Sequence, residues 1–147
     1  MTNAALRTVT LPTGRILGAA WIGCLSVGLV WTAVARVLGD SWPSALNGLA
    51  AAGVVAVAAA AVLIVIRPWR AKTLAQWPVV WVAGSFARLA VTIGGTFLLY
   101  SSTRFGGKSL WLAVAAAYLA AMIGETRVYV ASMRRFAPGH GKPSPPE

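Results

Sequence analysis

Residues 45–66 read ALNGLAAAGVVAVAAAAVLIVI, an apolar stretch without a single charged residue. At a rise of 1.5 Å per residue, a helix of this length crosses the roughly 30 Å of hydrocarbon in a bilayer. The stretch is so rich in alanine that a helix made from it has almost no bulky surface. Such a helix is expected to pack closely against its neighbours in a membrane.

Three more apolar runs of similar length, 16–38, 78–100 and 109–131, accompany this one in the chain of 147 residues. Hydrophobic residues make up 58% of the sequence and charged residues 11%, and the mean hydropathy is +0.71. This composition is too apolar for a water-soluble domain of this length. The sequence therefore predicts an all-α, polytopic membrane protein, with four transmembrane helices in a bundle.

Two shorter segments flank the predicted transmembrane domain of residues 16–133. Residues 1–15 form a basic N-terminal segment that contains Arg7 and Arg15. Residues 134–147 are rich in proline and glycine, which disfavours a packed structure, and we expect a flexible cytoplasmic tail there.

The basic residues indicate how the helices are oriented, because positively charged short loops resist translocation. One side of the predicted bundle receives most of them: Arg7, Arg15, Arg67, Arg70, Lys72, Arg134, Arg135 and Lys142. The loop on the other side carries Arg104 and Lys108. This bias predicts that both termini lie in the cytoplasm.

The formal charge of +10 does not indicate nucleic-acid binding, because the basic residues lie at the ends of apolar runs and do not line one polar face. We expect contacts with lipid headgroups from Arg67, Arg70, Lys72, Arg134 and Arg135. Four tryptophans flank the predicted spans, where their amphipathic rings suit the headgroup region: Trp42, Trp69, Trp77 and Trp111.

Arg88 is the one charged residue inside the third run, about 15 Å from the end of its span by helical rise. Glu125 lies about 9 Å deep on the next span. A long arginine side chain can cover this offset, so we expect an interhelical contact between Arg88 and Glu125. The contact either fixes the orientation of the two helices as a structural clasp or forms part of an ion or proton path. Arg127 and a cation on another subunit are alternative partners for Glu125.

Small residues at helical spacing form a candidate packing face on the fourth span: Ala113, Ala117, Ala120 and Gly124. Gly94 and Gly95 offer a similar close approach on the third span. Such a face serves either packing within the bundle or contact with another membrane protein.

Catalytic signatures are missing from the sequence, so we expect no enzymatic activity, no metal and no cofactor. The lone histidine, His140, is in the predicted tail, and no base lies beside a nucleophile. The loop Gly106-Gly107-Lys108 lacks the strand, the helix and the full glycine pattern of a phosphate-binding loop.

The short-looped spans, the basic connection between the second and third spans, and two local sequences resemble the ATP synthase protein I family. The local sequences are Gly84-Ser85-Phe86-Ala87-Arg88-Leu89 and the end of the fourth span from Tyr118 to Glu125-Thr126-Arg127. The spans depart from a typical member in their many alanines and tryptophans. The resemblance implies a multi-pass accessory protein of the bacterial inner membrane that helps assemble the rotor ring of ATP synthase, with Arg88 and Glu125 in contacts to partner subunits.

Two other functions fit the same sequence features. The first is an accessory structural subunit of another large membrane complex, respiratory or photosynthetic, although direct pigment ligation is disfavoured without an intramembrane histidine. The second is a small ion transporter that uses Arg88, for which broken helices and further polar midspan residues would be expected. In each case the partners are membrane lipids and other transmembrane subunits.

Overall fold

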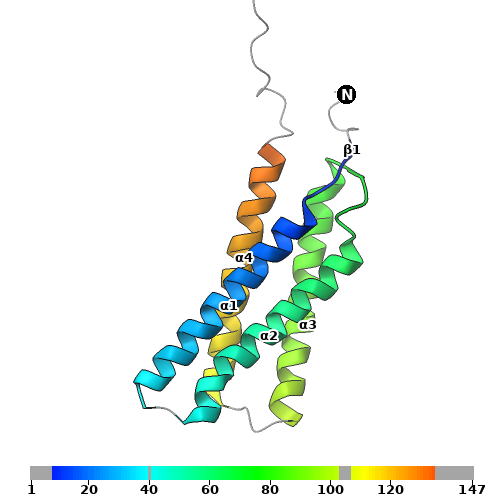
Figure 1. Ribbon diagram of the computed structural model, residues 1–147. Helices are drawn as coiled ribbons and strands as arrows, with labels where there is room; N and C mark the ends of the chain where they lie inside the picture. Colours follow the sequence, from blue (N-terminus) through cyan, green and yellow to red (C-terminus); the bar gives the residue numbers. More distant parts are fainter. Residues whose placement is uncertain (1–7, 40, 103–106, 135–147) are drawn as a thin grey trace, which may run out of the picture.

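The computed structural model describes residues 8–39, 41–102 and 107–134 of the chain. Within these ranges it contains four helices and one pair of very short strands (Figure 1). The helices are α1 (Thr13–Val37), α2 (Trp42–Ile66), α3 (Gln76–Ser102) and α4 (Lys108–Arg134), and the strands are β1 (Thr8–Val9) and β2 (Lys72–Thr73). Each helix is long and apolar enough to cross a membrane, so the prediction of an all-α protein with four such helices is confirmed.

The helices extend beyond most ends of the predicted spans. α1 begins at Thr13, inside the predicted N-terminal segment, and α4 ends at Arg134, the first residue of the predicted tail. The apolar run marks the part of a helix that suits hydrocarbon, whereas the helix continues into polar residues that can reach the headgroups. The rest of the predicted tail, residues 135–147, lies outside the described residues.

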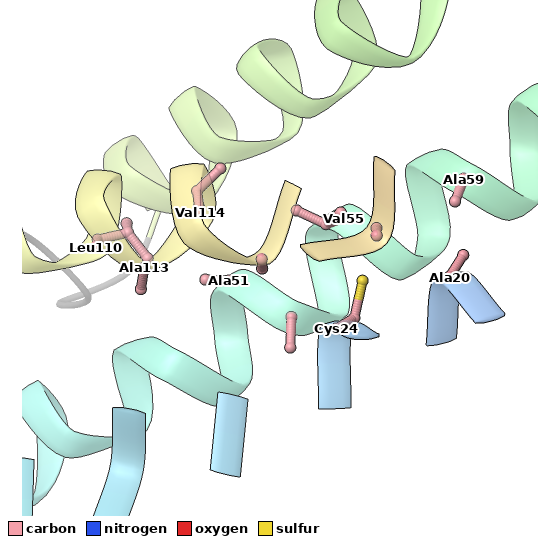
Figure 2. Close-up of a cluster of buried hydrophobic side chains, with 11 residues drawn as sticks. Ala20, Cys24, Ala51, Val55, Ala59, Leu110, Ala113 and Val114 are labelled. Atoms are coloured by element: carbon pink, nitrogen blue, oxygen red, sulfur yellow. The ribbon is translucent and has the colours of Figure 1, made fainter. Parts of the chain in front are cut away.

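The core of the bundle is built from α1, α2 and α4, and its buried residues are mostly alanine (Figure 2). These residues are Ala20, Cys24, Ala51, Ala52, Val55, Ala59, Leu110, Ala113, Val114, Ala117 and Ala121. Because alanine projects only a methyl group, the three helix backbones come close together.

Glycines stand where α1 crosses its two neighbours. A Cβ atom added to Gly23 would lie 3.0 Å from the carbonyl oxygen of Ala120, and one added to Gly124 would lie 3.0 Å from that of Ala19. Ala19 and Gly23 on α1 therefore face Ala120 and Gly124 on α4, four residues apart on each helix. The α1–α2 contact contains Gly28 and Gly48 in the same way.

α3 is attached differently from the other three helices. Its backbone packs against α2, and it reaches α4 through long side chains. Gly84 makes the close approach to α2 possible, since an added Cβ atom would collide with the end of the Ile66 side chain. α3 thus leaves room beside α4 for polar and aromatic groups.

The connection between α2 and α3 carries Arg67, Arg70 and Lys72, and its end of the bundle is here called the basic end. The segment before α1 packs against this connection. β1 pairs antiparallel with β2, and the backbone N–H of Leu11 donates to the carbonyl of Pro68 at 3.1 Å. Trp77 is fully buried there and its indole Nε1 donates to the carbonyl of Val9 at 3.1 Å. The expectation that the Trp77 ring lies in the headgroup region is therefore wrong, because this side chain is buried against the N-terminal segment.

The glycine contacts give a first testable prediction. A Cβ atom at Gly48 would lie 2.7 Å from Cβ of Trp31 and 2.9 Å from the carbonyl oxygen of Gly28. We expect Gly48→Ala to lower the free energy of unfolding in mixed detergent micelles by about 1–3 kcal/mol, because α1 and α2 must separate.

Gly53→Ala on the same helix is the matched control. An added Cβ atom there meets nothing within 4 Å, and alanine favours a helix over glycine by up to about 1 kcal/mol. Equal stability of the two variants would contradict the proposed role of Gly48.

Candidate functional site

The ion pair between Arg88 on α3 and Glu125 on α4 is the most unusual feature of the bundle interior. The Arg88 Nη1 donates to Glu125 Oε1, and each residue exposes only 4% of its surface. The structure thus brings together the two charged residues that the sequence singled out. Arg127, the alternative partner considered for Glu125, is exposed.

Both members of the pair stand next to a close helix contact. Gly84, one turn before Arg88, lies against Ile66 of α2, and Gly124, the neighbour of Glu125, lies against Ala19 of α1. These contacts hold α3 against α2 and α4 against α1, so that the two charged side chains meet inside protein. A charge in this position must be paired or hydrogen-bonded to be tolerated.

Aromatic side chains on both sides of the pair also connect α3 to α4. The ring centre of Tyr118 is 5.3 Å from Cζ of Arg88, and its Oη donates to the carbonyl of Ser85 at 3.2 Å. Toward the basic end, Trp81 and Tyr129 stack with ring centres 4.6 Å apart. Sequence reasoning did not assign these contacts. Helical spacing could have indicated the stacked pair, because Trp81 precedes Arg88 by seven residues and Tyr129 follows Glu125 by four. Each aromatic ring therefore lies on the same helix face as a member of the ion pair.

A small cavity of about 20 Å³ adjoins the ion pair. Its lining comes from α2, α3 and α4: Ala59, Val62, Leu63, Ile66, Trp81, Gly84, Ser85, Arg88 and Glu125. The volume suffices for one water molecule. The buried Nε of Arg88 makes no hydrogen bond with any described residue and is the donor that such a water would accept from.

The predicted packing face lies mainly inside the bundle. Ala113 and Ala117 are buried in the alanine-rich core, and Ala120 and Gly124 face α1. Gly95 packs against Val54 of α2, where an added Cβ atom would be 3.1 Å from Cγ1. Gly94 differs, since it is exposed and an added Cβ atom would meet nothing within 4 Å. The close approach expected at Gly94 is therefore not made by the described part of the chain.

The residues expected to contact lipid headgroups differ in how exposed their side chains are. Arg67, Arg70 and Arg134 are exposed, and Arg135 lies outside the described residues. Lys72 is partly buried, and its Nζ donates to the carbonyls of Ile66 and Arg67 at the C-terminus of α2. Burial, and secondarily the charge of Arg70, lowers the pKa of Lys72. The partly buried ammonium group thus caps the C-terminus of α2.

The fold and the site together define a class: a four-helix protein, each helix of membrane-spanning length and apolarity, with a buried ion pair between α3 and α4. Among the described residues, no group of three or more His, Cys, Asp or Glu side chains is placed to hold a metal ion. Comparisons with protein-family models, with curated proteins and with solved structures find no match to this chain.

A double-mutant cycle tests how the ion pair acts. We expect Arg88→Met and Glu125→Leu each to lower the free energy of unfolding by about 3–5 kcal/mol, because each leaves a buried charge without its partner. The double variant Arg88→Met/Glu125→Leu removes both charges and is expected to be more stable than either single variant.

The matched control combines Glu125→Leu with Arg36→Met, which removes an exposed arginine at the far end of α1. Its two effects on the free energy of unfolding should add. Additive effects of Arg88→Met and Glu125→Leu would show that the two side chains do not depend on each other.

Proposed function

We propose that this protein is a multi-pass protein of the bacterial cytoplasmic membrane with both termini in the cytoplasm. The large apolar side chains exposed on all four helices support a membrane location, because water does not solvate such a surface well. The charge distribution supports the orientation. Arg15, Arg67, Arg70 and Arg134 lie at or near the helix ends of the basic end, and Arg36 and Lys108 lie near the helix ends on the opposite side.

Within that membrane, the proposed function is that of a non-catalytic accessory protein that assists assembly of the rotor ring of an ATP synthase. The resemblance of the spans to the ATP synthase protein I family suggests this partner. The observation that supports a non-catalytic role is that Arg88 and Glu125 pair with each other inside the chain. Their pairing stabilises a helix arrangement whose outer surface is free to contact other membrane helices.

The same observation disfavours the ion-transporter alternative. A translocated ion needs a polar route with several stops, whereas the space beside the Arg88–Glu125 pair is about 20 Å³. The guanidinium group is also already neutralised by a carboxylate on the neighbouring helix. Structural support for helix packing is the simpler use of the pair.

Two shallow apolar grooves on the outside of α2 are suitable places for a partner helix. One runs between α1 and α2 and holds about 600 Å³, and the other runs between α2 and α3 and holds about 330 Å³. Gly53 and Val57 of α2 belong to both grooves. Small residues at such a surface let a second helix approach closely, which is how membrane helices associate.

Purification in a mild detergent tests the proposed partner. We expect the tagged full-length protein to retain subunits of the ATP synthase. Gly53→Ile should reduce their recovery severalfold, because the added side chain occupies both grooves while the position itself has open space.

Leu112→Phe is the control for added apolar bulk, because Leu112 is exposed on α4 outside both grooves. Its recovery of ATP synthase subunits should match that of the unaltered protein. A preparation of the unaltered protein without any such subunit would overturn the proposed partner, and equal recovery with Gly53→Ile would overturn the role of the grooves.

A further inference from the structure

Two arginines lie on the outer face of α4, and a headgroup contact was expected from the sequence at only one of them, Arg134. Arg127 and Arg134 are seven residues apart, two helical turns, so their side chains leave the same face of the helix. Both are exposed, and both line a surface groove of about 750 Å³. The other described residues that line it are Leu119, Met122, Ile123, Thr126, Val130 and Ala131.

This groove is lined by charged side chains toward one end and by apolar side chains toward the other. Arg134, the last residue of α4, lies at the basic end, and Arg127 is about 10 Å further along the helix axis. Leu119, Met122 and Ile123 continue the same face one to two turns deeper. An amphipathic ligand with an anionic head and an apolar tail matches this order.

Neither arginine has an acidic partner among the described residues. The carboxylate in those ranges belongs to Glu125, which is buried and paired with Arg88. Residues two apart on a helix point to different sides, which separates Arg127 from Glu125. The guanidinium of Arg127 therefore needs a counterion from outside these parts of the protein.

The length of α4 places Arg127 near the headgroup region of a bilayer. Its 27 residues span about 40 Å, which exceeds a hydrocarbon thickness of roughly 30 Å by about 10 Å. Because α4 begins with Lys108 at the opposite end, the excess is assigned to the basic end, and Arg127 is then level with the boundary of the hydrocarbon. The anions available there are lipid phosphates, which arginine binds through charge-assisted hydrogen bonds.

We propose that this α4 groove is a binding site for one acidic phospholipid. The phosphodiester lies between Arg127 and Arg134, next to the hydroxyl of Thr126, and an acyl chain lies along Leu119, Met122 and Ile123. The proposal rests on the membrane location proposed above, and not on the identity of the partner complex. It assigns to Arg127 a ligand contact that is separate from the Arg88–Glu125 pair on the other side of the helix.

Native mass spectrometry of the delipidated full-length protein in a neutral detergent tests the site. Phosphatidylglycerol is the probe, and phosphatidylcholine, which carries no net charge, is the comparison lipid. We expect phosphatidylglycerol to bind more tightly, and Arg127→Gln and Arg134→Gln each to weaken its binding about fivefold, as loss of roughly one charge contact per arginine implies.

Arg15→Gln is the matched control, since Arg15 is an exposed arginine near the basic end but on α1. A general attraction between basic residues and anionic lipid would make all three variants weaken binding equally, which would overturn the proposal. Equal binding of phosphatidylcholine and phosphatidylglycerol to the unaltered protein would also overturn it, because the groove would then act only as an apolar surface.

Folding and membrane location are checked separately. The circular dichroism of each variant should match that of the unaltered protein, because the altered arginines are exposed and make no ion pair with the described residues. Flotation of the unaltered protein with phosphatidylcholine liposomes tests membrane location without an anionic lipid. Flotation together with equal lipid binding by all variants would reject the α4 site and leave the membrane location standing.

Discussion

A buried guanidinium and a buried carboxylate impose the strongest constraint on this bundle. Arg88 and Glu125 are each almost fully enclosed, and each would be costly to bury alone. The helices must therefore bring the two side chains together. Gly84 and Gly124 allow this, because they let α3 approach α2 and α4 approach α1 beside the pair. The charges thus restrict the helix arrangement, and the glycines make that arrangement sterically possible.

The four helices associate in two physically different ways. α1, α2 and α4 are joined by close backbone contacts through alanine and glycine, as at Gly23 and Gly124. α3 and α4 are joined by the ion pair, by the Tyr118 hydroxyl and by the stacked rings of Trp81 and Tyr129. Close packing maximises dispersion contacts between smooth surfaces, whereas the second kind of contact needs space for large side chains. This difference explains why the polar groups gather beside α3.

The location of the remaining charges agrees with the role proposed for the outer surface. Most exposed basic residues lie near the helix ends, where they can reach headgroups, and the large exposed apolar residues lie between them. Arg127 stands further along its helix and outside the bundle, which is why a lipid phosphate is the counterion inferred for it. Both proposals use this outer surface, one for a partner helix in the grooves of α2 and the other for a lipid on α4.

The amino-acid sequence alone predicted the four apolar helices and the position of Arg88 within its span, and it indicated Glu125 as one candidate partner, which the structure confirms. Span length, charge and depth depend only on local composition and helical rise. The tertiary structure decided which helices pack through glycine, that Trp77 is buried beneath the N-terminal segment, and that Lys72 caps α2. It also showed that Gly94 is exposed although Gly95 packs. Membrane-facing and core-facing small residues look alike in a sequence, because the way each helix is rotated about its axis is set by its neighbours.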